Sequence, residues 1–538
     1  MEIRAAFAFV LALFLAMALI PPLVRLAGPL HLLDAGGGRK VHTGRIPRVG
    51  GVAIFVGFVV PVLIWMPMDD GIGAFVAAAA VLFAFGLLDD RFNLDYRLKL
   101  LGQFLAAAIV TVGGDLLFRQ VPFWPGGVLP EMLALPATML ILAAITNAVN
   151  LSDGLDGLAG GISLLAVAGL LFLDAREGAD ALIIVLAAML GAILGFLRFN
   201  TFPARLFMGD AGSQLLGFSV GVLAIMITQR PDGALSPVLP LLVLGLPILD
   251  MLTVIAGRLS RGQSPFVADR THLHHRLLAS GLTQSEAVGL IYGTQFLLVA
   301  LAYLLRDARD GTILLCYLVF CGLALAGERV IEHYRASLRE RPLRREPIAR
   351  VLAWLRANRL TVRLPEWLLN LAIPGFLVAG ALGAPSVGLD IGLLAATLGT
   401  ALLVALFIRR LPFFTLERLS AYTAALAVAY LLAGSSIAAC PQCMPLFYVV
   451  VAICAALWVR FSSAGFQVST LDLLILLGAL AAPTLRDLGL KDIGILALQA
   501  IVLFYGIEVL LQARERRWDT LRAGSIAALA ILAVRGLS

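Results

Sequence analysis

Apolar runs of about 17 to 20 residues recur along the whole chain and are separated by shorter polar stretches. Each run is nearly free of charge and is long enough to cross a bilayer core of roughly 30 Å as a helix. The pattern predicts an all-α, polytopic integral membrane protein with about eighteen transmembrane helices. The predicted spans lie near residues 5–24, 50–66, 71–88, 99–114, 133–150, 157–174, 181–197, 212–229, 238–256, 288–305, 312–327, 367–383, 389–408, 421–438, 445–459, 470–483, 493–511 and 522–536.

The polar loops between these runs differ in positive charge. Alternate loops carry 32 of the 41 Lys and Arg residues, and the asymmetry continues to the last loop. Because positive loops stay on the cytoplasmic side, the N-terminus is predicted to face outward. The loop after the first run is its more basic flank, so this run is interpreted as a retained helix and not as a signal peptide.

Composition supports the membrane class. Of 538 residues, 60% are apolar and 14% are charged, which argues against a water-soluble fold. The net charge of +7 is explained by topology, so we expect membrane lipids as neighbours and no nucleic acid. Cys440 and Cys443 form a CxxC motif on the predicted outer side. A disulfide between them and two incidental thiols are both open interpretations.

The longest polar break divides the chain at residues 328–366, a basic segment predicted to be a cytoplasmic linker. Residues 1–327 contain about eleven predicted helices and the dense polar clusters. Residues 367–538 contain about seven more, with loops that carry mostly arginines and turn residues. Chemistry is therefore expected in the first part, and the role of the second is open.

Five polar clusters interrupt the apolar pattern, and the predicted topology places all of them on the cytoplasmic face. The simplest interpretation is one site assembled from five loops. The clusters are RKVHTGRIPRVGG (39–51), LLDDRFNLDYRLKLLGQ (87–103), NAVNLSDGLDGLAGG (147–161), FNTFPARLFMGDAGS (199–213) and DRTHLHHRL (269–277).

The acids of these clusters stand at predicted helix ends. Asp89 and Asp90 follow an apolar run, where the helix dipole opposes negative charge, so the pair needs a cation. Asp210 and Asn150 lie near predicted helix starts and could be ordinary N-caps. Capping needs only one such residue, and free N–H groups at a helix start suit phosphate, while oxygen ligands suit Mg²⁺.

Two further clusters are basic. His272, His274 and His275 lie within four consecutive positions and are flanked by arginines, which argues against core packing. Zinc is the rival interpretation, but the other candidate ligands are oxygens, so anion binding fits better. Lys40 and His42 belong to a second basic loop, for which a mere topology signal is the alternative. Acids, a hard cation, helix starts and two basic loops indicate a diphosphate site at the membrane surface, and phosphoryl transfer needs this set of groups.

The five clusters, in this order, resemble the polyprenyl-phosphate N-acetylaminosugar-1-phosphate transferases, and the resemblance covers roughly residues 1–327. It implies that undecaprenyl phosphate attacks the β-phosphorus of a UDP-aminosugar and releases UMP. It implies a bacterial inner-membrane enzyme with a cytoplasmic active site that initiates cell-envelope polysaccharide synthesis. The extension after residue 327 departs from the usual pattern of the family.

The resemblance also implies residue roles. Asp210, assisted by Asn150, would hold Mg²⁺, with Mn²⁺ as an alternative, and Asp89 and Asp90 would bind or deprotonate the lipid phosphate. A covalent nucleophile is the open alternative for Asp89, and direct attack with Asp89 as the base is favoured. Phe207 would stack on uracil. The remaining substrate contacts would come from Lys40, His42, Asn147, Asp153, Asp156, His272, His274 and His275.

The histidine cluster THLHHRLLASGLT looks like the branch that uses UDP-GlcNAc, with UDP-GalNAc or a diacetamido sugar as competitors. The rival function is a transporter or flippase of lipid-linked sugars. Transporters place ionisable groups near the bilayer midplane, whereas the acids here cluster at helix ends on one side. A homodimer is an open alternative to a monomer.

Overall fold

The computed structural model of the chain describes residues 2–34, 45–176, 182–230, 233, 235–264, 271–340, 360–407, 413–433, 443–461, 491–513 and 520–538. The described residues are predominantly helical and pack into two compact units. The first unit contains the described residues up to Glu340, and the second contains those from Leu360 onward. Each unit is described by itself.

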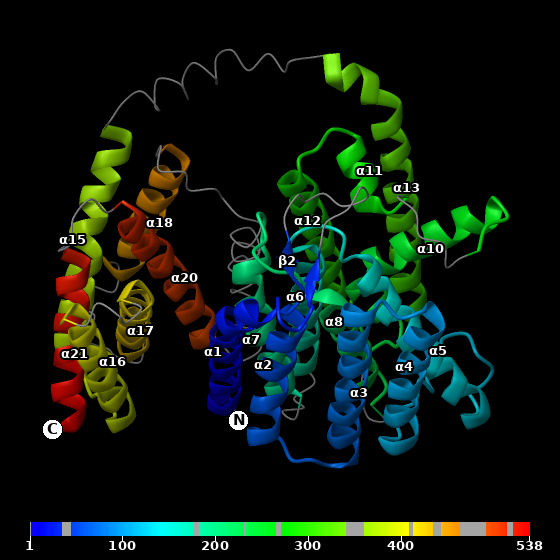
Figure 1. The fold of residues 1–538 in the computed structure, drawn as a ribbon, viewed down its shortest axis with the longest axis horizontal. Helices are drawn as coiled ribbons and strands as arrows, with labels where there is room; N and C mark the ends of the chain where they lie inside the picture. The colour runs from blue at the N-terminus through cyan, green and yellow to red at the C-terminus, as the bar shows by residue number, and fades with distance from the viewer. Residues whose placement is uncertain are drawn as a thin grey trace. The chain divides into compact units, whose positions relative to one another are not determined.

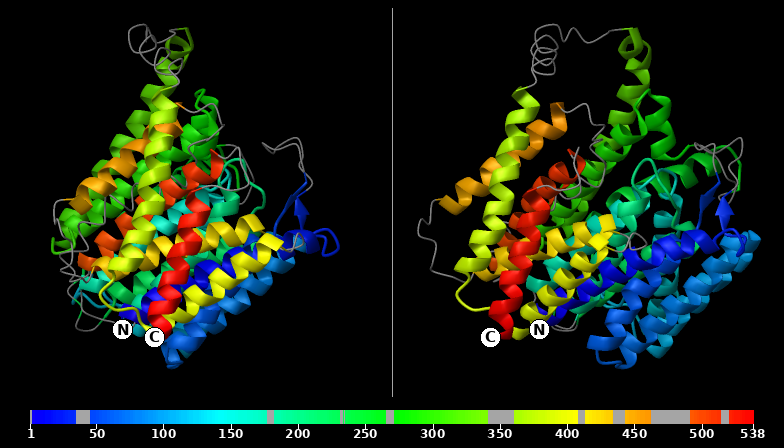
Figure 2. Two further views of the ribbon diagram at one scale, coloured as in Figure 1. Left: turned by 90° about the vertical axis from the view of Figure 1, so that its left-hand side faces the viewer. Right: turned by 60° about the vertical axis from the view of Figure 1, so that its left-hand side comes forward.

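In the first unit, helices follow the apolar runs and end at the polar clusters. Figures 1 and 2 show these helices as ribbons. A short antiparallel pair, β1 (Leu33–Asp34) with β2 (Ile46–Pro47), precedes the second helix. The helices are α1 (Glu2–Leu26), α2 (Gly50–Trp65), α3 (Asp70–Phe92), α4 (Tyr96–Ala108) with a π-helical turn (Ile109–Gly113), α5 (Glu131–Leu151), α6 (Leu158–Arg176), α7 (Ile183–Asn200), α8 (Gly209–Thr228), α9 (Pro240–Val243), α10 (Gly245–Ser260), α11 (Leu273–Ala279), α12 (Gln284–Leu304) and α13 (Asp310–Glu340).

Among the described residues, eleven helices are long and apolar enough to cross a membrane, which confirms an all-α membrane protein. The total of about eighteen spans and the outward N-terminus remain predictions. The predicted span at 470–483 and Cys440 lie outside the described residues, so the pairing of Cys440 with Cys443 also remains a prediction.

Helix α8 lies at the centre of the first unit, and 94% of the residues in its most apolar 18-residue stretch are buried. Glycines let two neighbours approach its first turn. A Cβ on Gly51 of α2 would lie 2.5 Å from the backbone nitrogen of Gly212, and one on Gly86 of α3 would lie 2.5 Å from the Cα of Ala211. Because no side chain fits there, α2 and α3 pack directly against the α8 backbone.

The single helix predicted near 238–256 is instead two, because the chain breaks at Leu244 between α9 and α10. Carbonyl groups at such a break need partners where water is scarce. Gln295 of α12 donates a hydrogen bond to the carbonyl of Val243 at 2.6 Å, and Tyr317 of α13 donates one to that of Gly245 at 3.1 Å. These bonds stabilise the redirected α10, which projects from the side of its unit in Figure 1.

The second unit packs its helices around an apolar core that includes Trp458. Its described helices are α15 (Leu360–Gly383), α16 (Leu389–Phe407), α17 (Phe413–Ala433), α18 (Cys443–Phe461), α20 (Lys491–Gln512) and α21 (Thr520–Leu537).

Two ion pairs join helices of this unit, although the sequence pattern alone shows no acid cluster in this half. Arg522 of α21 donates to Glu417 of α17, Nε to Oε1, at 2.8 Å, and both side chains are at most 5% exposed. Arg418 donates to Glu508 of α20 at 2.8 Å. A buried ion pair fixes which helices can pack together, since neither charge is tolerated alone.

Candidate active site

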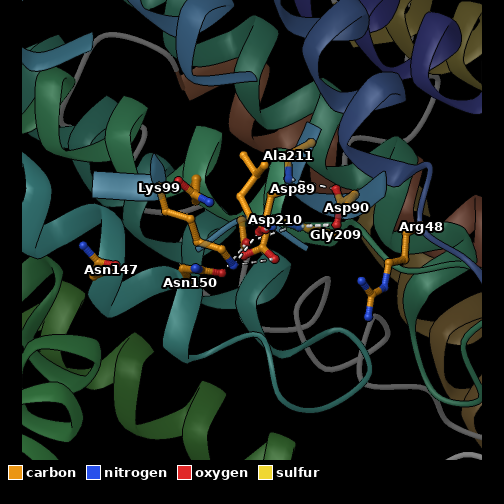
Figure 3. A network of polar contacts seen from close by, with 12 residues as sticks. Arg48, Asp89, Asp90, Lys99, Asn147, Asn150, Gly209, Asp210 and Ala211 are labelled. Atoms are coloured by element: carbon orange, nitrogen blue, oxygen red, sulfur yellow. Dashed lines mark hydrogen bonds and ion pairs between the residues drawn. The ribbon is translucent and has the colours of Figure 1, made fainter. Parts of the chain in front are cut away.

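Three charged side chains from separate helices meet at one end of the first unit (Figure 3). Lys99, in the first turn of α4, forms an ion pair with Asp89, in the last turn of α3. The Nζ atom of Lys99 also lies 3.4 Å from Oδ2 of Asp210, in the first turn of α8. Asp89 is 2% exposed, and its Oδ1 accepts a hydrogen bond from the backbone N–H of Leu94 at 2.7 Å. Lys99 therefore supplies the positive charge that acids at a helix C-terminus require.

Asp90 bridges α3 and α8. Its two carboxylate oxygens accept hydrogen bonds from the backbone N–H groups of Asp210 at 2.9 Å and Ala211 at 3.0 Å. Gly209 has a φ of +70°, and a Cβ there would lie 2.3 Å from the Asp90 carboxylate. Asp90 thus caps α8 from another helix. These two N–H groups are not available to a phosphate, contrary to the expectation of a free helix start.

Asn150 and Ser213 join α5 to α8. The Ser213 hydroxyl donates to Oδ1 of Asn150 at 2.7 Å, and its oxygen also lies 3.1 Å from the carbonyl oxygen of Gly209. Met208 is the N-cap of α8 and makes no side-chain capping bond, so neither Asp210 nor Ser213 serves as an ordinary N-cap. Asn150 also interacts with Asp210 and lies in the last turn of α5, so the two proposed metal ligands are neighbours.

Asn147 belongs to a network of side-chain amides behind these residues. Its Nδ2 donates to Oε1 of Gln103 in α4 at 2.7 Å, and Nε2 of Gln103 donates to Oε1 of Gln214 in α8 at 3.2 Å. Gln103 and Gln214 are each 1% exposed. Because buried amides are costly without partners, the network fixes α4, α5 and α8 relative to one another.

The loop between α5 and α6 is fastened to the segment that precedes α8. Asp156 accepts a hydrogen bond from the backbone N–H of Ala204 at 2.9 Å, and Asn200 accepts one from Gly157 at 3.0 Å. Asp153 on this loop is exposed, and its carboxyl lies in the field of the negative charge of Asp210.

Phe207 is held beside the end of the basic loop. Its N–H donates to the carbonyl of Pro47 at 2.8 Å, and its carbonyl accepts from Gly50 at 2.9 Å. Arg48 donates to Asp34 at 2.7 Å, which anchors β2 to β1. The segment PRVGG therefore contacts the backbone of LFMG. Lys40 and His42 lie outside the described residues, and their roles remain predictions.

The histidine cluster packs against the loop that follows α5. A Cβ on Gly154 would lie 2.1 Å from Nε2 of His274, so only glycine permits this contact. The rings of His274 and His275 are 4.3 Å apart. Burial, followed by the neighbouring His275, lowers the pKa of His274 to about 3. His274 is therefore neutral near pH 7 and can contact an anion only through an N–H group.

The donor atoms at Asp210 suit a hard divalent cation. Among the described residues, no group of three or more His, Cys, Asp or Glu side chains could hold a metal ion. Mg²⁺ does not need such a cage, since it binds through one or two carboxylates together with substrate phosphates. Asp89, Asp210 and Asn150 are oxygen donors in one place, and a cation, the Lys99 ammonium, already lies between the two carboxylates.

The structure brings Asp89, Asp90, Asn150 and Asp210 together, with Asn147 one layer behind them, while the histidines adjoin the loop of Asp153. The sequence pattern did not single out four further residues of this region. They are Lys99, Gln103, Gln214 and Asp250, whose carboxylate lies 2.9 Å from Nδ1 of His272. Lys99 had a signal, because it lies in the first turn of the helix that follows the paired acids. No comparable signal in the sequence indicates Asp250, because a single acid in an apolar run does not show which residue it contacts.

Comparison with known proteins identifies the family. Residues 72–228 match Glycosyl transferase family 4. A Bacillus subtilis (strain 168) protein named probable undecaprenyl-phosphate N-acetylglucosaminyl 1-phosphate transferase is 36% identical over 57% of this chain and 86% of its own length. The Escherichia coli (strain K12) undecaprenyl-phosphate alpha-N-acetylglucosaminyl 1-phosphate transferase is 33% identical over 52% of this chain and 78% of its own. The chain belongs to the polyprenyl-phosphate N-acetylaminosugar-1-phosphate transferase family.

A third relative, from Mycolicibacterium smegmatis (strain ATCC 700084 / mc(2)155), is named decaprenyl-phosphate N-acetylglucosaminephosphotransferase. It is 35% identical over 47% of this chain and 70% of its own length. The names of these relatives describe sugar-phosphate transferases. This chain is therefore a phosphotransferase, and it is a membrane protein. Asp89, Lys99 and Asp210 all lie within the matched residues 72–228.

Proposed function

We propose that this transferase moves N-acetylglucosamine 1-phosphate from UDP-GlcNAc to undecaprenyl phosphate, releasing UMP and forming a lipid diphosphosugar. The meeting of Asp89, Lys99 and Asp210 at the shared end of α3, α4 and α8 is the observation that carries the proposal. The names of the three relatives support the sugar and the polyprenyl acceptor. UDP-GalNAc and a diacetamido sugar are the competing donors.

In this reaction an oxygen of the lipid phosphate forms a bond to the β-phosphorus of the donor. The bond from that phosphorus to the bridging oxygen breaks, and the oxygen leaves with its electron pair as part of UMP. Where the lipid phosphate still carries a proton, Asp89 accepts it as the general base. The hydrogen bond from Leu94 and the ion pair with Lys99 hold the Asp89 carboxylate in place for this step.

Asp210 and Asn150 would hold Mg²⁺ or Mn²⁺, which when bound spreads the charge of the diphosphate. Asp90 keeps Asp210 in position through the backbone of α8. The Lys99 ammonium group would donate hydrogen bonds to the incoming phosphate. Its positive charge already offsets the negative charges of Asp89 and Asp210, the two carboxylates that the substrates approach. Its 29% exposure leaves part of its side chain open to solvent.

The segment around Phe207 is the proposed place for uridine. The phenyl ring would stack on uracil, and Asp156 and Lys40 would contact the edge of the base. The backbone of Phe207 is fixed by hydrogen bonds through both its N–H and its carbonyl, which gives the Cα atom a defined position. His272, His274 and His275 would contact the diphosphate, with His274 as a neutral N–H donor.

The site is proposed to face the cytoplasm in a bacterial inner membrane and to initiate envelope polysaccharide synthesis. The excess of Lys and Arg in the loops that carry the polar clusters supports this orientation. A transporter is disfavoured, because Asp89, Lys99 and Asp210 gather at the ends of α3, α4 and α8.

Purified protein in lipid vesicles tests the proposal directly. UMP should form from UDP-GlcNAc only when undecaprenyl phosphate and Mg²⁺ or Mn²⁺ are both present, and UDP-GalNAc should react more slowly. UMP release without the lipid would contradict transfer, and equal use of both donors would contradict the sugar assignment. Asp210→Asn should remove turnover while thermal unfolding shows a folded protein.

A further inference from the structure

Asp250 of α10 connects that helix to the histidine cluster. One carboxylate oxygen, Oδ2, lies 2.9 Å from Nδ1 of His272, and the other accepts a hydrogen bond from the backbone N–H of Leu273 at 2.7 Å. Asp250 is 7% exposed and His272 is 6% exposed. A guanidinium nitrogen of Arg276 lies 3.7 Å from Oδ1. Both oxygens of this buried carboxylate therefore face α11 and the residue before it.

The position of Asp250 follows from the break at Leu244. The break redirects α10, and Gln295 and Tyr317 fix its start through the two carbonyl groups beside the break. Asp250 stands in the second turn after this anchored start.

The contact sets the protonation of the imidazole ring. An ionised carboxylate only accepts hydrogen bonds, so Nδ1 of His272 carries a hydrogen. Nε2 then carries a lone pair, so it can contact a phosphate oxygen only after it has taken a further proton. A carboxylate that fixes the tautomer of a functional histidine is a recurrent device, and its loss lowers turnover strongly.

We propose that Asp250 is a positioning residue that holds His272 in the Nδ1–H tautomer, so that Nε2 can take a proton from solvent and then donate a hydrogen bond to the diphosphate of the donor. The role in catalysis rests on the proposed function. The tautomer itself does not, because it is a property of the protein without substrate. A purely structural role, in which Asp250 only anchors Leu273, predicts no dependence on the His272 ring.

Asp250→Asn separates the two roles. The N–H of Leu273 requires the amide oxygen of Asn, which turns the Asn NH₂ group toward Nδ1 of His272. Two donors cannot face each other, so the ring must change to the Nε2–H tautomer. The chain has only six histidines, and ¹⁵N spectra of histidine-labelled protein resolve protonated from unprotonated ring nitrogens. His272→Gln assigns the signal by removing it.

We expect the wild-type signal of His272 to show a protonated Nδ1 and the Asp250→Asn signal to show a protonated Nε2. An Nε2–H tautomer in the wild type would overturn the proposal, whether or not the variant folds. The same spectra report on Asp250 even if the wild type transfers no sugar phosphate, so this result is independent of the proposed function.

Kinetics of the double variant complete the test. Asp250→Asn should lower kcat by about 10- to 100-fold with a smaller change in KM, the range seen when partners of ligating histidines are removed. In a His272→Gln background the same substitution should not lower kcat further. An equal loss in both backgrounds would overturn the proposal. Ser260→Ala, at the exposed end of α10, should leave kcat unchanged.

Discussion

The carboxylate of Asp90 accepts the backbone N–H of Asp210, so the last turn of α3 and the first turn of α8 are joined across 120 residues of sequence. This bond places Asp89, the neighbour of Asp90, beside the Asp210 side chain. Two adjacent acids thus have different tasks. Asp90 builds the site through the backbone, and Asp89 faces the Lys99 ammonium within it.

Asp90→Ala should therefore lower both stability and turnover. Loss of the capping bonds should cost about 1–2 kcal/mol of unfolding free energy. Turnover should fall on the order of 10²-fold, because Asp210 moves relative to Asp89. Asp69→Ala is the matched control, since Asp69 caps the other end of α3 through the N–H of Ile72 at 2.8 Å. Thermal unfolding should show a similar loss of stability in both variants. Equal losses of turnover would contradict the role of Asp90 in positioning Asp210.

Lys99→Met should reduce turnover and also strengthen metal binding. Lys99 compensates the same carboxylates that approach the metal, so its removal leaves more negative charge for the cation. The Mn²⁺ concentration for half-saturation, measured from the paramagnetic signal of the ion, should fall on the order of tenfold. Arg97→Met, at an exposed position of the same helix, should change neither quantity. Unchanged metal affinity in Lys99→Met would argue against a shared site.

His274 should make stability sensitive to acid. Its pKa of about 3 in the folded protein is lower than its ordinary value, so below about pH 6.5 the unfolded chain binds a proton that the folded protein resists. Stability is thus lost as the pH falls from about 6.5 toward 3, by at most about 1.4 kcal/mol per pH unit.

His274→Gln should flatten this dependence in thermal unfolding measured between pH 4 and pH 8. His31→Asn, at an exposed position, is the control and should leave it unchanged. Parallel curves for the wild type and His274→Gln would show that the ring is not held neutral by burial.

Glu417→Gln should destabilise the second unit by about 3–5 kcal/mol, because it leaves the Arg522 guanidinium buried without its counter-charge. Arg418→Met removes a pair whose arginine is 40% exposed and should cost about 0–1 kcal/mol. Chemical denaturation of the full chain, followed by a probe attached to the second unit, measures the difference. Equal effects would contradict the burial argument.

The sequence predicts the helices and the five polar clusters well, because a membrane demands long uncharged runs and makes each polar residue conspicuous. It also predicts that Asp89 and Asp210 meet, through the family resemblance. It does not separate Asp89 from Asp90, since their roles depend on backbone groups 120 residues away. The break at Leu244 is hidden because the run stays apolar, and the Asp250 contact depends on that break.

The buried pair of Glu417 and Arg522 escapes prediction for a related reason. Both residues stand near the ends of helices, where sequence reading assigns charges to loops and topology. Only the packing of α17 against α21 shows that they lose contact with water.

The fate of the β-phosphorus tests the central claim most directly. Vesicles that contain the protein, undecaprenyl phosphate and Mg²⁺ should transfer ³²P from the β-position of UDP-GlcNAc into the lipid fraction, with unlabelled UMP in solution. Asp210→Asn protein should transfer none. Recovery of the label in soluble UDP or inorganic phosphate, with none in lipid, would contradict sugar-phosphate transfer at this site.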